Sequence, residues 1–244
     1  AFDDEAVLSA VDGTGALTGY GSLVHFPPSA ENVSFGRVPA TGLDASSGGA
    51  EFWPQQAHTF GQDNPPDVAT FRTGAGATNA APLIGPVTIN EIMYHPVNPT
   101  NGVDDTNDEF IELFNPGTNA VGLAGWRLTG DTEYAFPTNA TLAAGAYLLL
   151  VSFAPTDTVT LAAFRTNYNL SGGVPVYGPY SEKLANSTFR LEIDRPATNG
   201  GYSTHIIVDR VGYRDIAPWP TAPDGGGESL QRTSSAIVGN TADN

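Results

Sequence analysis

Two glutamates within strand-like segments are the residues of this chain with the clearest potential for chemistry. Glu91 lies in VTINEIMYHP, residues 87–96, and Glu112 lies in DEFIELFNP, where large apolar residues surround it. Two carboxyl groups a few ångströms apart can serve general acid–base catalysis or glycoside hydrolysis. The alternative is structural: a buried Glu112 would be held by backbone donors or by an arginine such as Arg127. We expect the structural role and no catalytic residues.

The acidic loop VDDTNDE, residues 103–109, is the best candidate for binding a metal ion. Its carboxylate and amide oxygens are the ligands that Ca²⁺ prefers. The spacing is not that of an EF-hand, so a solvated loop is the competing interpretation. The calcium ligands that the sequence predicts are Asp104, Asp105, Asn107, Asp108 and Glu109.

Two further groups of residues leave other chemistry open. Lys183 precedes Asn186 closely and would form an amide crosslink with it if both were buried beside an acid. Trp53, Trp126 and Trp219, with nine tyrosines, could line a sugar-binding face, although tryptophans in such segments more often pack in a core.

The composition restricts the partners and the class of protein. Ten Lys and Arg residues stand against 26 Asp and Glu residues, which gives a formal net charge of −16. Such a surface repels phosphate backbones and anionic lipid, so nucleic acid and membrane surfaces are not expected partners. The chain has no cysteine, and its longest apolar run, YLLLV, is far shorter than the roughly 18 residues of a membrane span.

The pattern of apolar residues predicts short strands joined by turns. Twenty-eight glycines and nineteen prolines favour many turns over long helices. One short helix is predicted around Phe164, capped by Thr156 or Asp157, and a parallel sheet would need many more. The chain is therefore predicted to be an all-β antiparallel sandwich. The predicted strands are residues 87–94, 109–115, 125–129, 146–153, 189–194 and 205–213.

The domain organisation follows from a linker and a weak internal repeat. Residues 65–85 are rich in Pro, Gly, Ala and Thr, which is typical of a linker. Residues 7–37 resemble residues 190–232 in the order of an alternating strand, a glycine turn, a second strand, a proline–aromatic loop and a Ser-apolar-x-Arg ending. Residues 1–64 are therefore expected to be the C-terminal half of a second sandwich, lying before the complete domain of residues 86–244.

The longer segment also resembles a known family. INEIMYHP, DEFIELFNPGTNAVGLAGWRL, FPTNATLAAGAYLLLVS and APWPTAPDGGGESLQR occur in the order found in the lamin-tail domain of large secreted bacterial proteins. AFRTNYNLSGGVPVYGPYSEKLANS is similar to the version in very large surface proteins of verrucomicrobial and planctomycete type. The resemblance covers about residues 86–244. It implies an immunoglobulin-like β-sandwich that occurs as one module among many and has no catalytic residues.

Together these features predict a non-enzymatic structural or assembly module of a large extracellular, cell-surface or filament-forming protein. Residues 1–64 are expected to pair with strands of a neighbouring module or of another copy, by strand complementation, because a half-sandwich exposes unpaired edges. An adhesive or carbohydrate-binding module is the main alternative. An accessory domain of a secreted hydrolase is the other. No cofactor is expected apart from the possible Ca²⁺.

Overall fold

The computed structural model describes residues 4–41, 50–58, 80–97, 103–199 and 201–244. The chain divides into two compact units. The first comprises Ala1–Val38, Glu51–Leu83 and Pro196–Ile206, and the second comprises Pro39–Ala50, Ile84–Arg195 and Ile207–Asn244. Most of the expected linker lies outside the described residues, so the domain boundaries proposed from the sequence stay a prediction.

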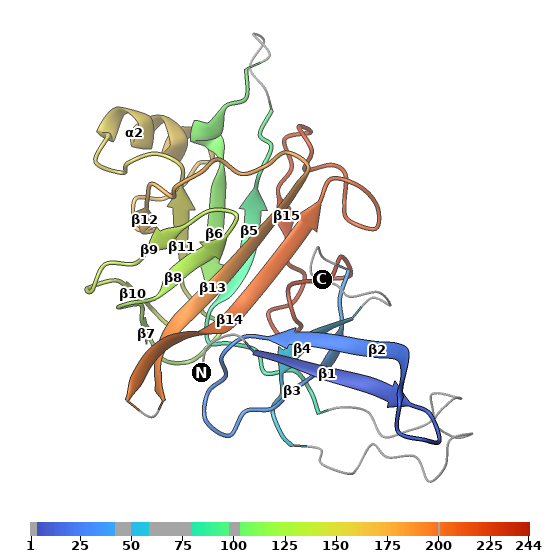
Figure 1. Ribbon diagram of the computed structural model, residues 1–244. Coiled ribbons are helices and arrows are strands. Elements are labelled where there is room, and N and C mark those ends of the chain that lie inside the picture. Colours follow the sequence, from blue (N-terminus) through green and yellow to red (C-terminus); the bar gives the residue numbers. More distant parts are fainter. Residues whose placement is uncertain (1–3, 42–49, 59–79, 98–102, 200) are drawn as a thin grey trace. The chain divides into compact units, whose positions relative to one another are not determined.

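The second unit contains two main sheets (Figure 1). The five-stranded sheet has the order β12-β11-β6-β5-β15, and the four-stranded sheet has the order β14-β13-β8-β9. The strands of the first are β5 (Thr88–Met93), β6 (Phe110–Phe114), β11 (Tyr147–Val151), β12 (Val176–Tyr177) and β15 (Leu230–Gln231). Those of the second are β8 (Arg127–Gly130), β9 (Tyr134–Ala135), β13 (Thr188–Asn199) and β14 (Tyr202–Arg214). A separate short pair joins β7 (Val121–Gly122) to β10 (Thr141–Leu142).

One apolar core lies between the two sheets. Successive side chains of a strand point to opposite faces, so alternate residues can enter the same core. Strand β6 contributes Ile111 and Leu113, strand β13 contributes Leu191 and Ile193, and all four side chains are fully buried in the same cluster. The antiparallel β-sandwich predicted from the apolar pattern is thereby confirmed. The six predicted strands correspond to β5, β6, β8, β11, β13 and β14.

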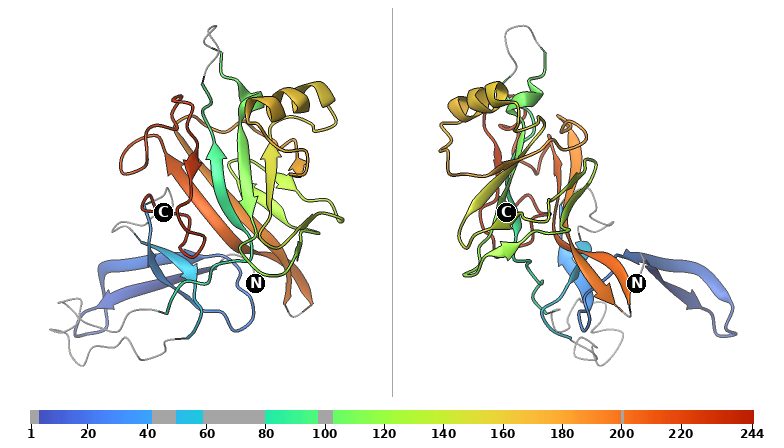
Figure 2. Two further views of the ribbon diagram at one scale, coloured as in Figure 1. Left: turned by 180° about the vertical axis from the view of Figure 1, so that it is seen from behind. Right: turned by 90° about the vertical axis from the view of Figure 1, so that its left-hand side faces the viewer.

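The one α-helix among the described residues covers the outer face of the five-stranded sheet (Figure 2). Helix α2 (Thr158–Asn167) begins after Asp157, whose carboxylate accepts hydrogen bonds from the first-turn amides. Phe164 packs edge-on against Phe110 of β6 and Phe153. The predicted helix is confirmed. It joins β11 to β12, which pair in parallel, so this sheet is not purely antiparallel.

The first unit contains two two-stranded sheets. Strands β1 (Asp4–Val11) and β2 (Leu17–Phe26) form one, and strands β3 (Phe35–Pro39) and β4 (Ala50–Pro54) form the other. Trp53 of β4 is buried, and its Nε1 donates a hydrogen bond of 2.9 Å to the Leu83 carbonyl. Helix α2 has ten residues, and among the described parts of the chain no helix is long and apolar enough to span a membrane.

Candidate functional site

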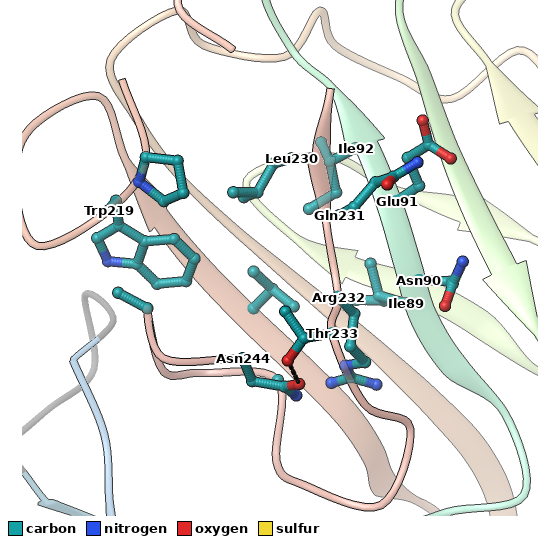
Figure 3. Close-up of a pocket in the computed structure, with 14 residues that line it drawn as sticks. Ile89, Asn90, Glu91, Ile92, Trp219, Leu230, Gln231, Arg232, Thr233 and Asn244 are labelled. Atoms are coloured by element: carbon teal, nitrogen blue, oxygen red, sulfur yellow. Dashed lines mark hydrogen bonds between the residues drawn. The ribbon is translucent and has the colours of Figure 1, made fainter. Parts of the chain in front are cut away.

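A β-bulge on β5 explains why the alternation of the segment INEI is interrupted. Ile89 pairs with Leu113 and Glu91 pairs with Glu112, with a shift in register between the two pairs. Ile89 and Ile92 both enter the inner core, although three positions separate them. The bulge therefore places Asn90 and Glu91 together on the outer side of β5, away from Trp219 (Figure 3).

The two glutamates that suggested catalysis are cross-strand neighbours, and each accepts a hydrogen bond from a nearby side chain. Asn90 Nδ2 donates to Glu112 Oε1 at 2.8 Å, and Ser229 Oγ donates to Glu91 Oε1. Burial raises the pKa of Glu112, and the charge of Glu91 adds to that rise. The expected Arg127 partner was wrong, because its Nε donates to Asp194 at 3.0 Å on the other sheet. Asn90 takes this role because the bulge brings it to the same face.

Replacing both glutamates by glutamine is expected to leave the free energy of unfolding unchanged or to raise it by about 0.5 kcal/mol. Like charges directly opposite one another across two strands are destabilising by a few tenths of a kcal/mol, and glutamine still accepts the bonds from Asn90 and Ser229. Urea unfolding of the Glu91→Gln/Glu112→Gln variant at pH 7 measures this effect. A loss above about 1 kcal/mol would mean that the negative charges themselves stabilise the fold.

The residues of the predicted calcium loop have different hydrogen-bond partners in the structure. Asp105 caps the short 3-10 helix η1 (Thr106–Asp108) by accepting from Asn107 N at 3.2 Å. Both oxygens of Asp108 accept from Asn167 Nδ2 at the end of α2. Within the described residues, no group of three or more His, Cys, Asp or Glu side chains is arranged to hold a metal ion. The five-residue calcium site stays a prediction. Of its members, Asp105 and Asp108 already accept hydrogen bonds, and Asn107 is exposed.

Glu109 is the most unusual acid of this loop because it is fully buried. Its Oε2 accepts hydrogen bonds from Tyr180 Oη and from Leu184 N, both at 3.0 Å. Burial raises the pKa of Glu109 to about 7, against the lowering effect of these two donors. The carboxyl group is thus close to the point where it changes charge at neutral pH.

Asp104 and Lys183 form an ion pair beside Glu109. Lys183 Nζ lies 3.0 Å from Asp104 Oδ2, and Asn186 Nδ2 donates to the same oxygen at 3.3 Å. The hydrogen bond and the charge of Asp104 raise the pKa of Lys183, whose side chain is 60% exposed. An amide crosslink to Asn186 requires a neutral amine in a dry site, and both features favour the charged, hydrated form instead. Intact-mass measurement checks whether the crosslink is present.

The second unit also holds a pocket of about 90 Å³ between β5, β15 and the C-terminal segment (Figure 3). Its wall is mainly apolar and includes Ile89, Trp219 and Leu230. Arg232 and Glu91 contribute the charged part of the wall. Asn90 and Glu91 also line this pocket, so it borders the glutamate pair, although Figure 3 shows their side chains directed away from Trp219.

Arg232 belongs to a buried ion pair that joins the edges of the two sheets. Its Nη2 lies 2.9 Å from Asp209 Oδ1, and the two side chains are only 4% and 3% exposed. Asp209 Oδ2 also accepts from Ile89 N at 2.7 Å. Gly239 allows this arrangement, because a Cβ at that position would collide with the guanidinium group. Asp209 therefore pairs with the guanidinium group of Arg232, which follows β15, and also accepts a hydrogen bond from a backbone amide of β5.

The tryptophans proposed for sugar binding are all buried. Trp53, Trp126 and Trp219 are 1%, 6% and 4% exposed, and the last two lie in the core between the sheets. This placement confirms the expectation that Trp126 and Trp219 pack in the sandwich. The side chains that remain available for stacking on a glycan are tyrosines such as Tyr20 and Tyr202.

Comparison with known proteins places the fold. A family model described as Lamin Tail Domain matches residues 80–213, more than half of the chain. No curated protein matches. Among solved structures, a DUF4876 family protein from Bacteroides thetaiotaomicron VPI-5482 is similar at a TM-score of 0.39 and 15% sequence identity, over 58% of this chain and 60% of that one. The chain thus spans less than two thirds of the length of that protein.

Proposed function

The chain belongs to the lamin tail domain family, and from this premise we propose that it is a non-enzymatic assembly module of a large extracellular or cell-surface protein. Domains of this immunoglobulin-like type are generally non-catalytic. The two glutamates with most potential for catalysis lie on the outer face of a sheet, and each is tied to a polar neighbour. A role in holding modules together fits these features better than a chemical reaction.

The observation that carries the proposal is the exposed apolar surface of the hairpin β1–β2. Val7 pairs with Leu23 and Val11 pairs with Leu17 across the two strands. We call the four exposed side chains of these pairs the apolar strip, and a shift in register between Ser9 and Val11 separates its two pairs. The four side chains are 51–73% exposed. No other described strand is hydrogen-bonded to β1 or β2, and an isolated hairpin is only marginally stable in water.

The internal repeat indicates how such a hairpin is normally covered. Its counterpart is the hairpin β13–β14, where β8 pairs with the edge of β13 and the five-stranded sheet covers the inner face. The strands that cover β13–β14 already pack against that hairpin within the same chain, so they are not available to β1–β2. Exchanging them between copies, as the strand complementation expected from the sequence requires, would replace one filled interface by another without gain. We therefore favour two copies that pack their β1–β2 strips against each other.

The magnitudes agree with a moderate affinity. Two strips contribute eight Val and Leu side chains, each worth about 1.5–3 kcal/mol if fully buried. Association itself costs about 4–15 kcal/mol, and the net charge of −16 on each copy opposes contact. The mid-range values, about 18 and about 10 kcal/mol, leave about 8 kcal/mol, which corresponds to a micromolar dissociation constant before charge repulsion weakens it.

Sedimentation equilibrium of the intact chain tests this assembly. The wild type is expected to dimerise, and added salt is expected to strengthen the dimer by screening the acidic surfaces. Val7→Lys should weaken dimerisation at least tenfold, because it places a charge within the apolar strip. Val159→Lys is the matched control, since Val159 on α2 is 78% exposed and lies outside the hairpin. A wild type that stays monomeric at about 100 μM, or equal effects of both substitutions, would refute the assembly.

The adhesive alternative has less support. Exposed tyrosines such as Tyr20 and Tyr202 are compatible with weak stacking on a polymer, whereas the three tryptophans are buried. A glycan array with the intact chain separates this alternative from an assembly module, which should bind no sugar. An accessory role beside a secreted hydrolase would require a catalytic partner elsewhere in the parent protein.

A further inference from the structure

Three buried oxygen atoms near the acidic loop accept no hydrogen bond from the described part of the chain. They are Glu109 Oε1, Asp104 Oδ1 and Asn186 Oδ1. Leaving a buried acceptor unsatisfied costs about 1–3 kcal/mol, so native proteins rarely leave several in one place. Only one of the three, Glu109, belongs to a side chain that is fully buried, which excludes direct hydration from bulk water there.

The turn of residues 183–186 gathers these three side chains. The Leu184 amide donates to Glu109 Oε2, while Lys183 Nζ and Asn186 Nδ2 both donate to Asp104 Oδ2. In each carboxylate one oxygen is fixed by the turn and the other remains free. The charge of Asp104 also contributes to the raised pKa of Glu109, as expected for neighbouring carboxylates. The turn thus gathers three free acceptors in one small region.

We propose that Asp104, Glu109 and Asn186 form a divalent-cation site that is selective for Ca²⁺. Two carboxylates and one amide oxygen are hard ligands, and Ca²⁺ accepts irregular oxygen sets completed by water better than Mg²⁺ does. Asp104 is 18% exposed, which leaves access for such water. Because one of its three ligands is the amide of Asn186, the site is not one of the groups of three or more His, Cys, Asp or Glu side chains, which are absent from the described residues.

This site differs from the five-residue prediction made from the sequence. Asp104 and Glu109 are retained. Asp105 and Asp108 are left out because neither has a buried oxygen that lacks a hydrogen-bond donor. Both oxygens of Asp108 accept from Asn167 Nδ2. Asn186 is added, and it lies 82 positions from Asp104 in the sequence, so local spacing could not reveal it.

Lys183 is the internal competitor of the cation. Its ammonium group neutralises Asp104 from a side chain that is 60% exposed and can turn into solvent. A bound Ca²⁺ would repel this ammonium group, so the two cations exclude each other. With only two carboxylates, the affinity is expected to be on the order of 10⁻⁴–10⁻³ M, as for calcium sites of extracellular modules.

Titration of the intact chain with CaCl₂, followed by calorimetry and by thermal unfolding, tests the site. Ca²⁺ is expected to bind once and to raise the melting temperature, whereas Mg²⁺ at equal concentration should have at least tenfold less effect. Asp104→Asn and Glu109→Gln should each weaken Ca²⁺ binding at least tenfold. Asp108→Asn is the matched control and should bind Ca²⁺ as the wild type does, because its oxygens face Asn167.

Lys183→Gln provides a test that does not depend on losing binding. Removing the competing ammonium should tighten Ca²⁺ binding about threefold to tenfold, a gain that a purely structural role of the ion pair would not produce. Terbium luminescence offers a second readout, because Tyr180 Oη lies 3.0 Å from Glu109 Oε2 and can sensitise a bound lanthanide. No heat and no melting shift with Ca²⁺, or equal losses in Asp104→Asn and Asp108→Asn, would overturn the proposal.

Discussion

Replacing Asp209 by alanine is expected to lower the free energy of unfolding by about 3–5 kcal/mol, the range for breaking a buried ion pair. The Arg232 guanidinium would remain in a site where its side chain is only 4% exposed, without its partner at 2.9 Å. The Ile89 amide would also lose its acceptor at 2.7 Å. Because small domains have total stabilities of about 5–15 kcal/mol, this loss should be visible as a large fall in the urea midpoint.

Two comparisons isolate the cause of that loss. Asp243→Ala makes the same change at an exposed position and should alter the stability by no more than about 0.5 kcal/mol. The double variant Asp209→Leu/Arg232→Leu removes both charges and should be more stable than Asp209→Ala, because no buried charge is left alone. A double variant as unstable as the single one would assign the loss to the Ile89 amide and to packing instead.

The architecture of the second unit was predictable because its main strands have a strict period. In β13, buried Leu191 and Ile193 alternate with the less buried Arg190 and Glu192, and this pattern specifies both the strand and its inner face. Strands β7, β9, β10, β12 and β15 have two residues each, too few to show any period, and they were missed. The parallel pairing of β12 with β11 was missed for the same reason, although the helix that connects them was predicted.

The candidate sites were predictable only in part, because their side chains come from distant segments. The sequence indicated Glu112 and the acidic loop, since acids among large apolar residues need an explanation. It did not indicate the partners Asn90 and Asn186, because the first depends on a bulge and the second on a turn after α2. A signal for the bulge was present: Ile89 and Ile92 are three positions apart, which regular alternation does not allow on one face.

Glu109 gives a prediction of opposite sign, in which removing a carboxylate stabilises the protein. Burial raises the pKa of Glu109 to about 7, whereas an unfolded glutamate titrates near 4.5. Between these pH values the folded chain holds a proton that the unfolded chain has released, so the stability falls as the pH rises from about 4.5 to about 7 and remains low above that. The loss from this one group is at most about 3 kcal/mol.

Glu109→Gln should abolish this contribution. Glutamine can still accept from Tyr180 and Leu184 through its carbonyl oxygen, and it carries no proton that titrates. In a chelating buffer, the variant is expected to match the wild type at pH 5 and to exceed its free energy of unfolding by about 1–3 kcal/mol at pH 8. Urea unfolding at pH 5, 6, 7 and 8 measures the difference, and Glu133→Gln, at an exposed position, should show no such trend.

Parallel profiles of wild type and Glu109→Gln would mean that Glu109 is already ionised at pH 5. With Ca²⁺ added, the difference in free energy of unfolding between Glu109→Gln and the wild type at pH 8 should become smaller or change sign. Only the wild type retains both carboxylates of the proposed site, and only an ionised Glu109 can hold the cation.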